Sequence, residues 1–258
     1  MVEIRNLSAG YPGNPVLSGI SLTLQEGSVT VIAGPNGSGK STLLKALAGI
    51  LPATGSARWN GQELLNLPPR ELAQKLAFLP QNRPVPEIAV RQLVLHGRFP
   101  YLSYPRRYRP ADYAIAEAAM EQMGIGDLAE RKLSTLSGGQ RQKVYIAMAL
   151  AQDTPVILLD EPNTFLDISH RLQLMEQAKS LAAAGKTVVL VLHDLTLALE
   201  WADSLAILGA GKCLFQGTAE ETFLSGILQE AFQVPVQRMS TPDGWKYYFS
   251  GRTFHKFK

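Results

Sequence analysis

The sequence predicts an α/β fold, in which parallel strands buried on both faces alternate with helices. Two observations carry this prediction. Residues 29–33, 156–159 and 187–192 are apolar almost throughout, which is typical of strands covered by helices on both sides. Each run is followed by glycine-rich or polar residues and then by a helix-forming segment. With 258 residues and 46% hydrophobic content, the chain is long enough to bury a full core.

The first elements in chain order are a strand-like segment over residues 2–7, the strand 29–33 and a glycine-rich loop that leads into the helix-forming segment 42–48. The loop and its first helical residues are Gly34, Pro35, Asn36, Gly37, Ser38, Gly39, Lys40, Ser41 and Thr42. In this setting the glycines let backbone N–H groups surround phosphates, and the helix start offers its positive end. Lys40 is placed to reach the outer phosphates and Ser41 to ligate magnesium. The sequence therefore predicts a nucleoside triphosphate site.

A more helical stretch follows over about residues 83–153. It contains residues 86–96 and a helix over 110–123 that ends at Gly124, as helices often do. The stretch interrupts the alternation of strands and helices, so it is predicted to be an insertion.

Near the end of this stretch, Ser137, Gly138, Gly139 and Gln140 precede a helical run over 141–152. Ser137 with Gln140 fits a capping box, which would explain the segment as a helix start alone. The glycines are not explained by capping, because glycine weakens a first turn unless the backbone must approach something closely. They indicate a second anion-binding loop, one without its own lysine.

Two acids end the strand over 156–159. Asp160 emerges at the carboxyl end, the edge at which ligands of open parallel sheets bind, so we expect it to share a magnesium-nucleotide with the first loop. Glu161 is placed to polarise the attacking water, which favours hydrolysis over transfer to a second substrate. The alternative is that these acids only cap the strand or start a helix.

His193 follows the strand over 187–192 at the same predicted edge. A lone histidine after a strand is more often a structural hydrogen-bonding group, but this edge favours a functional role. Further along, residues 211–217 read as part of a hairpin, 226–236 as a short helix and loop, and 245–249 as a strand. Cys213, the single cysteine, cannot form an internal disulfide and is assigned no chemistry.

In their order along the chain, these three motifs resemble the nucleotide-binding subunits of ATP-binding cassette (ABC) transporters, with residues 136–140 as the most specific element. The resemblance covers nearly the whole chain. It implies a P-loop NTPase (RecA-like) core with an antiparallel β subdomain and an inserted helical subdomain. We therefore expect a single ABC ATPase domain over 1–258, with its core at about 1–82 and 154–225, the helical subdomain at about 83–153 and a C-terminal extension at about 226–258.

The resemblance also implies roles for individual residues. Tyr11 matches the aromatic residue that stacks on adenine, although it could be an ordinary turn tyrosine. Gln81 matches the glutamine that contacts magnesium and the attacking water and couples the site to the membrane partner, although it could simply close a strand. Asp167 matches the loop that crosses between two ATPase subunits, in which Asn163 departs from the commonest pattern. His193 matches the switch histidine on the γ-phosphate.

The resemblance thus completes the expected site, with ATP and Mg²⁺ as its ligands. The expected catalytic residues are Glu161, His193 and Gln81, and the expected magnesium ligands are Ser41, Gln81 and Asp160. The loop from Ser137 to Gln140 is expected to meet the nucleotide of a second copy of the chain, with Asp167 near the same contact.

The segment over 97–101 is similar to one found in ATPases that serve importers of ferric siderophores, haem and cobalamin. This resemblance implies transmembrane permease subunits as partners, with a periplasmic or lipoprotein substrate-binding protein acting through them. In and after this segment, four arginines are interleaved with tyrosines: Arg98, Arg106, Arg107 and Arg109. They could form a solvated face with aromatic packing or a docking surface for a permease. The alternatives are a soluble, non-transport ABC ATPase in an assembly or regulatory complex, and a nucleotide-binding module without turnover.

Composition limits the location and the partners. No run of about eighteen apolar residues is present for a bilayer span, and Met1 leads directly into a strand-like segment without a secretion signal. We therefore expect a peripheral protein on the cytoplasmic face of the cell membrane. The formal charge of +3 is too small to imply nucleic-acid binding.

Overall fold

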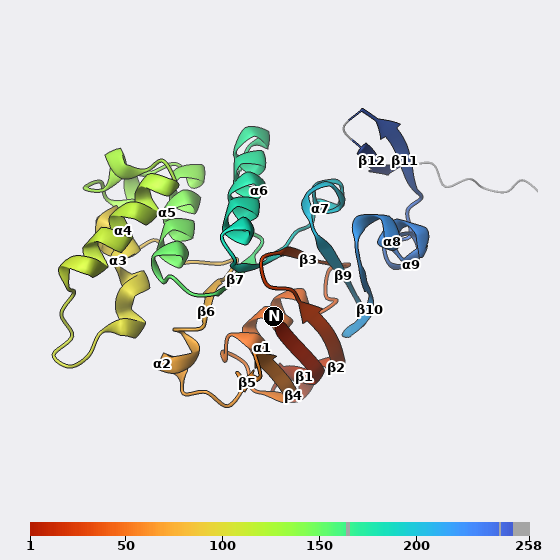
Figure 1. Ribbon diagram of the computed structural model, residues 1–258, viewed down its shortest axis with the longest axis horizontal. Helices are drawn as coiled ribbons and strands as arrows, with labels where there is room; N and C mark the ends of the chain where they lie inside the picture. Colours follow the sequence, from red (N-terminus) through yellow and green to blue (C-terminus); the bar gives the residue numbers. More distant parts are fainter. Residues whose placement is uncertain (164–165, 243, 250–258) are drawn as a thin grey trace, which may run out of the picture.

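The computed structural model of the chain describes residues 1–163, 166–242 and 244–249. Its centre is a six-stranded sheet in the order β10-β9-β3-β8-β7-β6 (Figure 1). All neighbours pair in parallel except β10, which is antiparallel to β9. The strands are β3 (Val29–Ala33), β6 (Leu76–Leu79), β7 (Val156–Asp160), β8 (Thr187–Val191), β9 (Ser204–Gly209) and β10 (Lys212–Gly217). The predicted parallel strands are thereby confirmed.

The parallel strands are buried on both faces, as their continuous apolar sequences predict. Successive residues of β3 enter different cores: Val31 and Ala33 join one hydrophobic cluster, and Ile32 joins the other. Helices α6 (Ile168–Ala183) and α7 (Leu195–Trp201) contribute to the first cluster. Because side chains alternate across a strand, a sheet covered on both sides needs apolar residues at every position.

A second, antiparallel sheet packs against the other side of α1, in the strand order β2-β1-β4-β5. Its strands are β1 (Val2–Tyr11), β2 (Asn14–Leu24), β4 (Ala53–Trp59) and β5 (Gln62–Glu63), and α1 spans Lys40–Leu47. Leu43, Leu44 and Leu47 of α1 share one cluster with both sheets. The first turn of α1 is thus fixed between two sheets, close to the edge where β3 ends.

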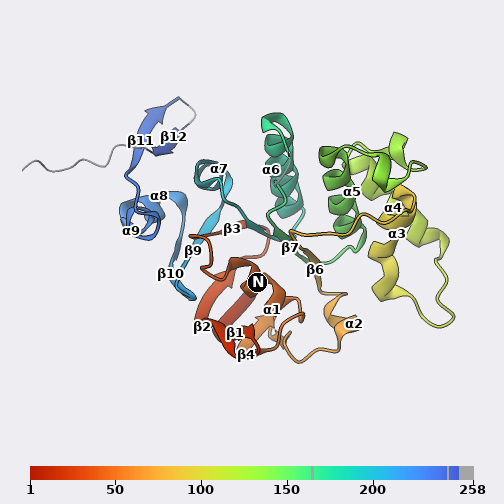
Figure 2. The same cartoon turned by 180° about the vertical axis from the view of Figure 1, so that it is seen from behind.

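The inserted segment forms a helical group that lies beyond β6 and β7, away from the antiparallel sheet (Figures 1 and 2). Its elements are α3 (Val90–Leu95), the 3₁₀ helix His96–Tyr101, α4 (Pro110–Gln122) and α5 (Gly138–Ala151); the short α2 (Pro69–Leu72) precedes β6. The helix over 110–123 is confirmed, whereas only Val90–Leu95 of the segment 86–96 is α-helical. The division of the chain into subdomains stays a prediction.

Arg98 lies inside this helical group and not on its surface. It is only 7% exposed, and its Nε atom donates to Asp112 Oδ1 at 3.2 Å. Its Nη1 atom donates to the carbonyl of Ala151 at 3.0 Å, and its guanidinium lies 4.0 Å from the centre of the Tyr101 ring. The expectation that Arg98 belongs to a solvated or docking face is therefore wrong. Arg106, Arg107 and Arg109 are exposed.

Replacing Arg98 by Met is expected to lower the free energy of unfolding by about 3 to 5 kcal/mol, because it leaves the Asp112 carboxylate buried without its partner. Burial would raise the pKa of Asp112, but hydrogen bonds from Arg109 and Arg98 lower it. A depressed carboxyl pKa stabilises the fold above the pKa of the unfolded state, about 4, and this contribution fades on acidification. Urea unfolding should show the lower free energy of unfolding of Arg98→Met at pH 7 and a smaller difference from the wild type at pH 4.

The exposed Arg107 provides the matched control for this experiment, since Arg107→Met removes the same charge outside the core. An equal effect of the two substitutions would contradict the structural role of Arg98.

The C-terminal part adds two short helices and a hairpin beside α7. These are α8 (Ala219–Leu224), α9 (Ile227–Phe232), β11 (Val236–Thr241) and β12 (Gly244–Phe249). Tyr247 is buried, and Arg238 stacks between the rings of Phe223 and Trp245 at 4.9 and 4.1 Å. The predicted strand over 245–249 is confirmed, and Asp243 lies outside the described residues. No helix within the described ranges has both the length and the hydropathy of a membrane span.

Candidate active site

The candidate site lies where β3, β8, β7 and β6 end. These strands are neighbours in the sheet and run parallel, so their carboxyl ends meet at one edge. The residues that follow them are Gly34 after β3, His193 after β8, Glu161 after β7 and Gln81 after β6. The structure therefore brings together groups that are distant in sequence, as the strand pattern predicts.

The loop from Gly34 to Gly39 depends on glycine at both of its ends. Gly34 has a φ of 155°, and a Cβ atom there would lie 2.2 Å from the carbonyl oxygen of Leu208. Gly39 has a φ of 100°, and its Cβ would lie 2.4 Å from Leu17 Cδ2. Side chains at these positions would collide with β9 and β2. Only glycine therefore allows the backbone of the loop to follow this path.

Lys40 begins α1 and folds back over the loop. Its Nζ atom donates to the carbonyls of Gly34 at 2.8 Å and Pro35 at 3.0 Å. Burial lowers the pKa of Lys40, while the nearby Glu161 and Asp160 act in the opposite direction. The ammonium is therefore held at the loop in a partly desolvated environment, where an added anion would be strongly favoured.

Ser38 and Ser41 supply the hydroxyls of the loop. Ser38 is 3% exposed, and its Oγ atom has no hydrogen-bond partner among the described residues. Because buried polar atoms are normally paired, an orphaned hydroxyl inside a glycine loop fits a phosphate oxygen. Ser41 Oγ donates to Asp160 Oδ1 at 3.0 Å. Thr42 is buried in the first turn of α1, behind these groups.

Asp160 is almost fully buried at 1% exposure. Burial raises its pKa, the hydrogen bond from Ser41 lowers it, and Glu161 raises it further. A bound cation would stabilise the charged form of this buried carboxylate. Carboxylate, hydroxyl and amide oxygens are the ligands that Mg²⁺ prefers. The described residues hold no cluster of three or more His, Cys, Asp or Glu that could bind a metal by itself. Magnesium at phosphates needs no such cluster, since it uses one or two protein ligands and the phosphates.

Glu161 is the centre of the candidate catalytic group. Its Oε1 atom lies 2.6 Å from His193 Nε2, and its Oε2 atom accepts from Gln81 Nε2 at 2.5 Å. Of the three residues that the sequence marks as catalytic, Gln81 and His193 thus both contact Glu161. Both carboxylate oxygens are engaged, so an attacking water would share Glu161 with Gln81 and His193 or compete with them for it.

The backbone of Glu161 is also unusual. Its φ of 49° is left-handed, a conformation that costs a residue with a Cβ about 1 to 3 kcal/mol and is common at functional sites. Asp160 and Glu161 are adjacent in sequence, yet this turn directs Asp160 to the loop and Glu161 to His193 and Gln81. The sequence contains no signal for this turn.

Tyr11 lies at the end of β1 with 44% of its surface exposed. Its Oη atom accepts from Lys45 Nζ at 3.4 Å, and Lys45 belongs to α1. The aromatic side chain is therefore on the same side of the molecule as the helix that carries the loop. This position suits a platform for a nucleotide base, although the role itself stays a prediction.

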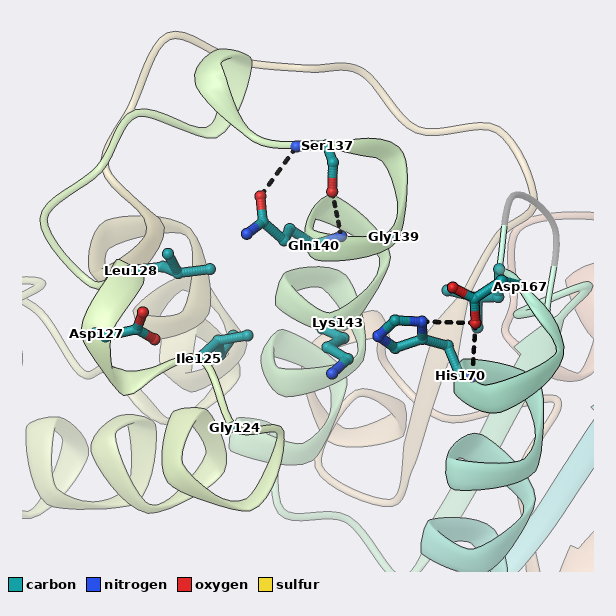
Figure 3. Close-up of a pocket in the computed structure, with 11 residues that line it drawn as sticks. Gly124, Ile125, Asp127, Leu128, Ser137, Gly139, Gln140, Lys143, Asp167 and His170 are labelled. Atoms are coloured by element: carbon teal, nitrogen blue, oxygen red, sulfur yellow. Dashed lines mark hydrogen bonds and ion pairs between the residues drawn. The ribbon is translucent and has the colours of Figure 1, made fainter.

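The second predicted anion loop lies at a separate pocket of ≈ 440 Å³ (Figure 3). Ser137, Gly139 and Gln140 of α5 line it together with Asp167 at the start of α6. The capping box is present: Ser137 Oγ accepts from Gln140 N at 3.3 Å, and Ser137 N donates to Gln140 Oε1 at 3.1 Å. None of the residues that line this pocket belongs to the group around Glu161. Gly138 faces another pocket, beside Gln81.

Asp167 caps α6. It accepts from His170 N at 2.9 Å, from Ser169 Oγ at 2.9 Å and pairs with His170 Nδ1 at 2.7 Å. These hydrogen bonds, first of all the one from His170 N, lower the pKa of Asp167 to about 2. The preceding Thr164 and Phe165, part of the expected inter-subunit loop, lie outside the described residues.

One contact was not predicted. Gln142 is buried in α5, and its Nε2 atom donates to the carbonyl of Pro162 at 2.5 Å. It ties the helix that begins at the second loop to the residue after Glu161. The only sequence signal is its place two residues after Gln140, which does not reveal its partner.

Comparison with known proteins identifies the family. A sequence model of the family described as ABC transporter matches residues 17–164, more than half of the chain. The chain belongs to the ABC transporter family. It is an ATP-binding protein of this family, and the loop at Gly34 as the place of ATP stays a prediction.

Relatives of this ABC protein match almost end to end. The achromobactin transport ATP-binding protein CbrD of Dickeya dadantii is 39% identical over 93% of this chain and 91% of its own length. The hemin import ATP-binding protein HmuV of Chelativorans sp. is 39% identical over 95% of both chains. The predicted family is thereby confirmed.

Solved ABC structures share the fold. A metal-chelate type ABC transporter in an inward-facing conformation matches with a TM-score of 0.82 and 27% identity over 96% of both chains. A nucleotide-free ATP-binding cassette of an ABC transporter matches with a TM-score of 0.81 and 26% identity, covering 90% of this chain and 97% of that one. The predicted ABC ATPase fold class is confirmed.

Proposed function

We propose that this ABC ATPase powers the import of an iron chelate or haem through transmembrane permease subunits. The observation that carries the proposal is the similarity, over 93% or more of the chain, to relatives named for achromobactin transport, iron(3+)-hydroxamate import and hemin import. The segment over 97–101 supports the same class, which by sequence resemblance also includes cobalamin.

The loop and its neighbours are proposed to hold magnesium-ATP. Lys40 exchanges its two backbone carbonyl acceptors for phosphate oxygens, and Ser38 Oγ gains the acceptor that it lacks. Ser41 and Asp160, already 3.0 Å apart, and Gln81 would hold Mg²⁺, which neutralises charge on the phosphates when bound.

Glu161 is proposed to accept the proton of the attacking water. The water would reach the carboxylate beside Gln81 and His193 or displace one of them, since each contacts one of its oxygens. Gln81 would then orient the water, and His193 would turn to the γ-phosphate, where its N–H stabilises the charge that develops. The water oxygen bonds to the γ-phosphorus as its proton passes to Glu161, and the bond from this phosphorus to the bridging oxygen breaks, so that ADP leaves with that oxygen.

Two copies of the chain are proposed to act together. Ser137 to Gln140 and Asp167 line a pocket apart from the catalytic group, so a nucleotide bound at Lys40 of one chain would meet this loop on the other. The assembled complex would also contain permease subunits at the cytoplasmic face of the membrane and a substrate-binding protein outside it.

Uptake by the reconstituted complex tests the function. The chain, copurified with its transmembrane subunits, should drive ATP-dependent accumulation of radiolabelled ferric hydroxamate, haem or cobalamin in proteoliposomes, and one of the three should be preferred. ATP hydrolysis without uptake of any of them would contradict the proposal. Copurification with soluble proteins alone would favour the alternative, a non-transport ABC ATPase.

A further inference from the structure

A pocket of ≈ 330 Å³ lies between the segment after β6 and one face of α5. The segment contributes Gln81, Asn82, Arg83 and Val85, and the helix contributes Gly138, Arg141, Gln142 and Tyr145. The helical residues are spaced at i, i+3, i+4 and i+7, so they lie on a single face. Neither the loop at Gly34 nor Ser137, Gly139 and Gln140 line this pocket.

Two arginines in this pocket have unused donors. Arg83 Nη1 and Arg141 Nε are both buried and have no hydrogen-bond partner among the described residues. Within residues 1–163, 166–242 and 244–249, neither arginine forms an ion pair with a carboxylate. A buried N–H group without an acceptor is costly, because it loses water and gains no hydrogen bond in return. Two such groups in one pocket indicate a missing acceptor.

Two further polar groups of the pocket, those of Tyr145 and Gln142, already have partners. Tyr145 Oη donates to the carbonyl of Pro84, and Gln142 Nε2 donates to that of Pro162. The guanidinium of Arg83 lies 4.9 Å from the centre of the Tyr145 ring. Burial raises the pKa of Tyr145, and the charges of Arg83 and Arg141 oppose this rise, so both guanidinium groups lie near its ring. The pocket therefore presents two cationic donors around an aromatic wall.

We propose that this pocket is an oxyanion site, in which a carboxylate or phosphate group accepts hydrogen bonds from Arg83 Nη1 and Arg141 Nε. Guanidinium groups suit planar or tetrahedral oxyanions, and charge-assisted hydrogen bonds to them are strong. The oxyanion comes either from an acidic side chain of an associated subunit or from a free anion in solution. Both sources have the same recognition chemistry.

The site is connected to the catalytic group. Arg83 Nε and Nη2 lie 3.4 Å from the carbonyl oxygen of Gln81, whose side chain holds Glu161. An oxyanion that draws the guanidinium toward Arg141 would loosen this contact and free Gln81 to move. This consequence rests on the proposed role of Gln81 in hydrolysis, whereas the existence of the site does not.

The first experiment measures binding of malonate and inorganic phosphate to the full chain by the shift of its thermal unfolding midpoint. It uses the Lys40→Met background, so that binding at the nucleotide loop does not contribute. A free-anion site predicts a saturable rise that becomes at least tenfold weaker in Arg83→Gln/Arg141→Gln and is unchanged in the exposed Arg107→Gln. Circular dichroism and the unfolding midpoint without anion check that the double variant is folded.

The second experiment identifies a side-chain source in the complex purified with its transmembrane subunits. A photoreactive residue at Val85, on the rim of the pocket, should crosslink to a segment that contains Asp or Glu, and charge reversal of that acid should restore the complex of Arg83→Glu. Anion binding or this crosslink with rescue supports the site and names its source. An anion response unchanged in the double variant, without an acidic crosslinked segment, overturns it. Neither measurement depends on ATP turnover. A negative result here is therefore distinguishable from a failure of the proposed function.

Discussion

Glu161→Gln is expected to keep ATP binding and to abolish turnover in the assembled transporter. The amide preserves the size of the side chain but cannot take the proton of the attacking water, and loss of a general base costs on the order of 10²- to 10⁴-fold in rate. The adjacent carboxylate of Asp160 accepts a hydrogen bond from Ser41 at the loop, whereas Glu161 contacts Gln81 and His193, so Asp160 is not placed to replace it. Phosphate release and equilibrium binding of a fluorescent ATP analogue separate the two effects.

Glu176→Gln is the matched control, since Glu176 is an exposed acid on α6, away from the sheet edge. It should hydrolyse ATP at the wild-type rate. Retained hydrolysis in Glu161→Gln would refute the assignment of the base, and loss of ATP binding would show that the substitution damages the nucleotide site.

Lys40→Met is expected to weaken ATP binding by roughly 10²-fold. The substitution keeps an apolar stem but removes an ammonium that is held at the loop by two carbonyls, and charged hydrogen bonds contribute about 1.5 to 3 kcal/mol each. Turnover should fall with affinity and should not recover at high ATP concentration, because the same charge stabilises the phosphate during transfer. Titration with a fluorescent ATP analogue measures the loss.

Removal of an exposed lysine, Lys212→Met on β10, controls for the change in net charge. The thermal midpoint of Lys40→Met should stay near that of the wild type, because burial opposes the charged form of this lysine. Wild-type affinity in Lys40→Met would contradict the phosphate-loop assignment.

The arrangement of the site follows from the sequence to a large extent, because parallel strands impose it. Once residues 29–33, 156–159 and 187–192 are recognised as strands buried on both faces, their carboxyl ends must share an edge. Glu161 and His193 are then close without any knowledge of their side chains. The order of β8 between β3 and β7, however, is a property of the folded sheet that no local pattern contains.

Contacts made by side chains across the fold could not be predicted. Arg98 stands in a segment rich in arginine and tyrosine, and nothing in that composition shows that it alone turns inward to Asp112. The link from Gln142 to Pro162 and the unpaired donors of Arg83 and Arg141 depend likewise on how α5 is rotated against the sheet. The left-handed turn at Glu161 depends on its neighbours in space, since glutamate has no preference for it.

The contacts of the Glu161 carboxylate have a consequence for cells that make more of this chain than of its partners. Each of its oxygens already lies against an Nε2 atom, so a water molecule that approaches this base competes with Gln81 and His193. We therefore expect a copy outside the complex to hydrolyse ATP more slowly than an assembled one in which Gln81 or His193 is drawn aside. Surplus copies would then consume little of the nucleotide pool.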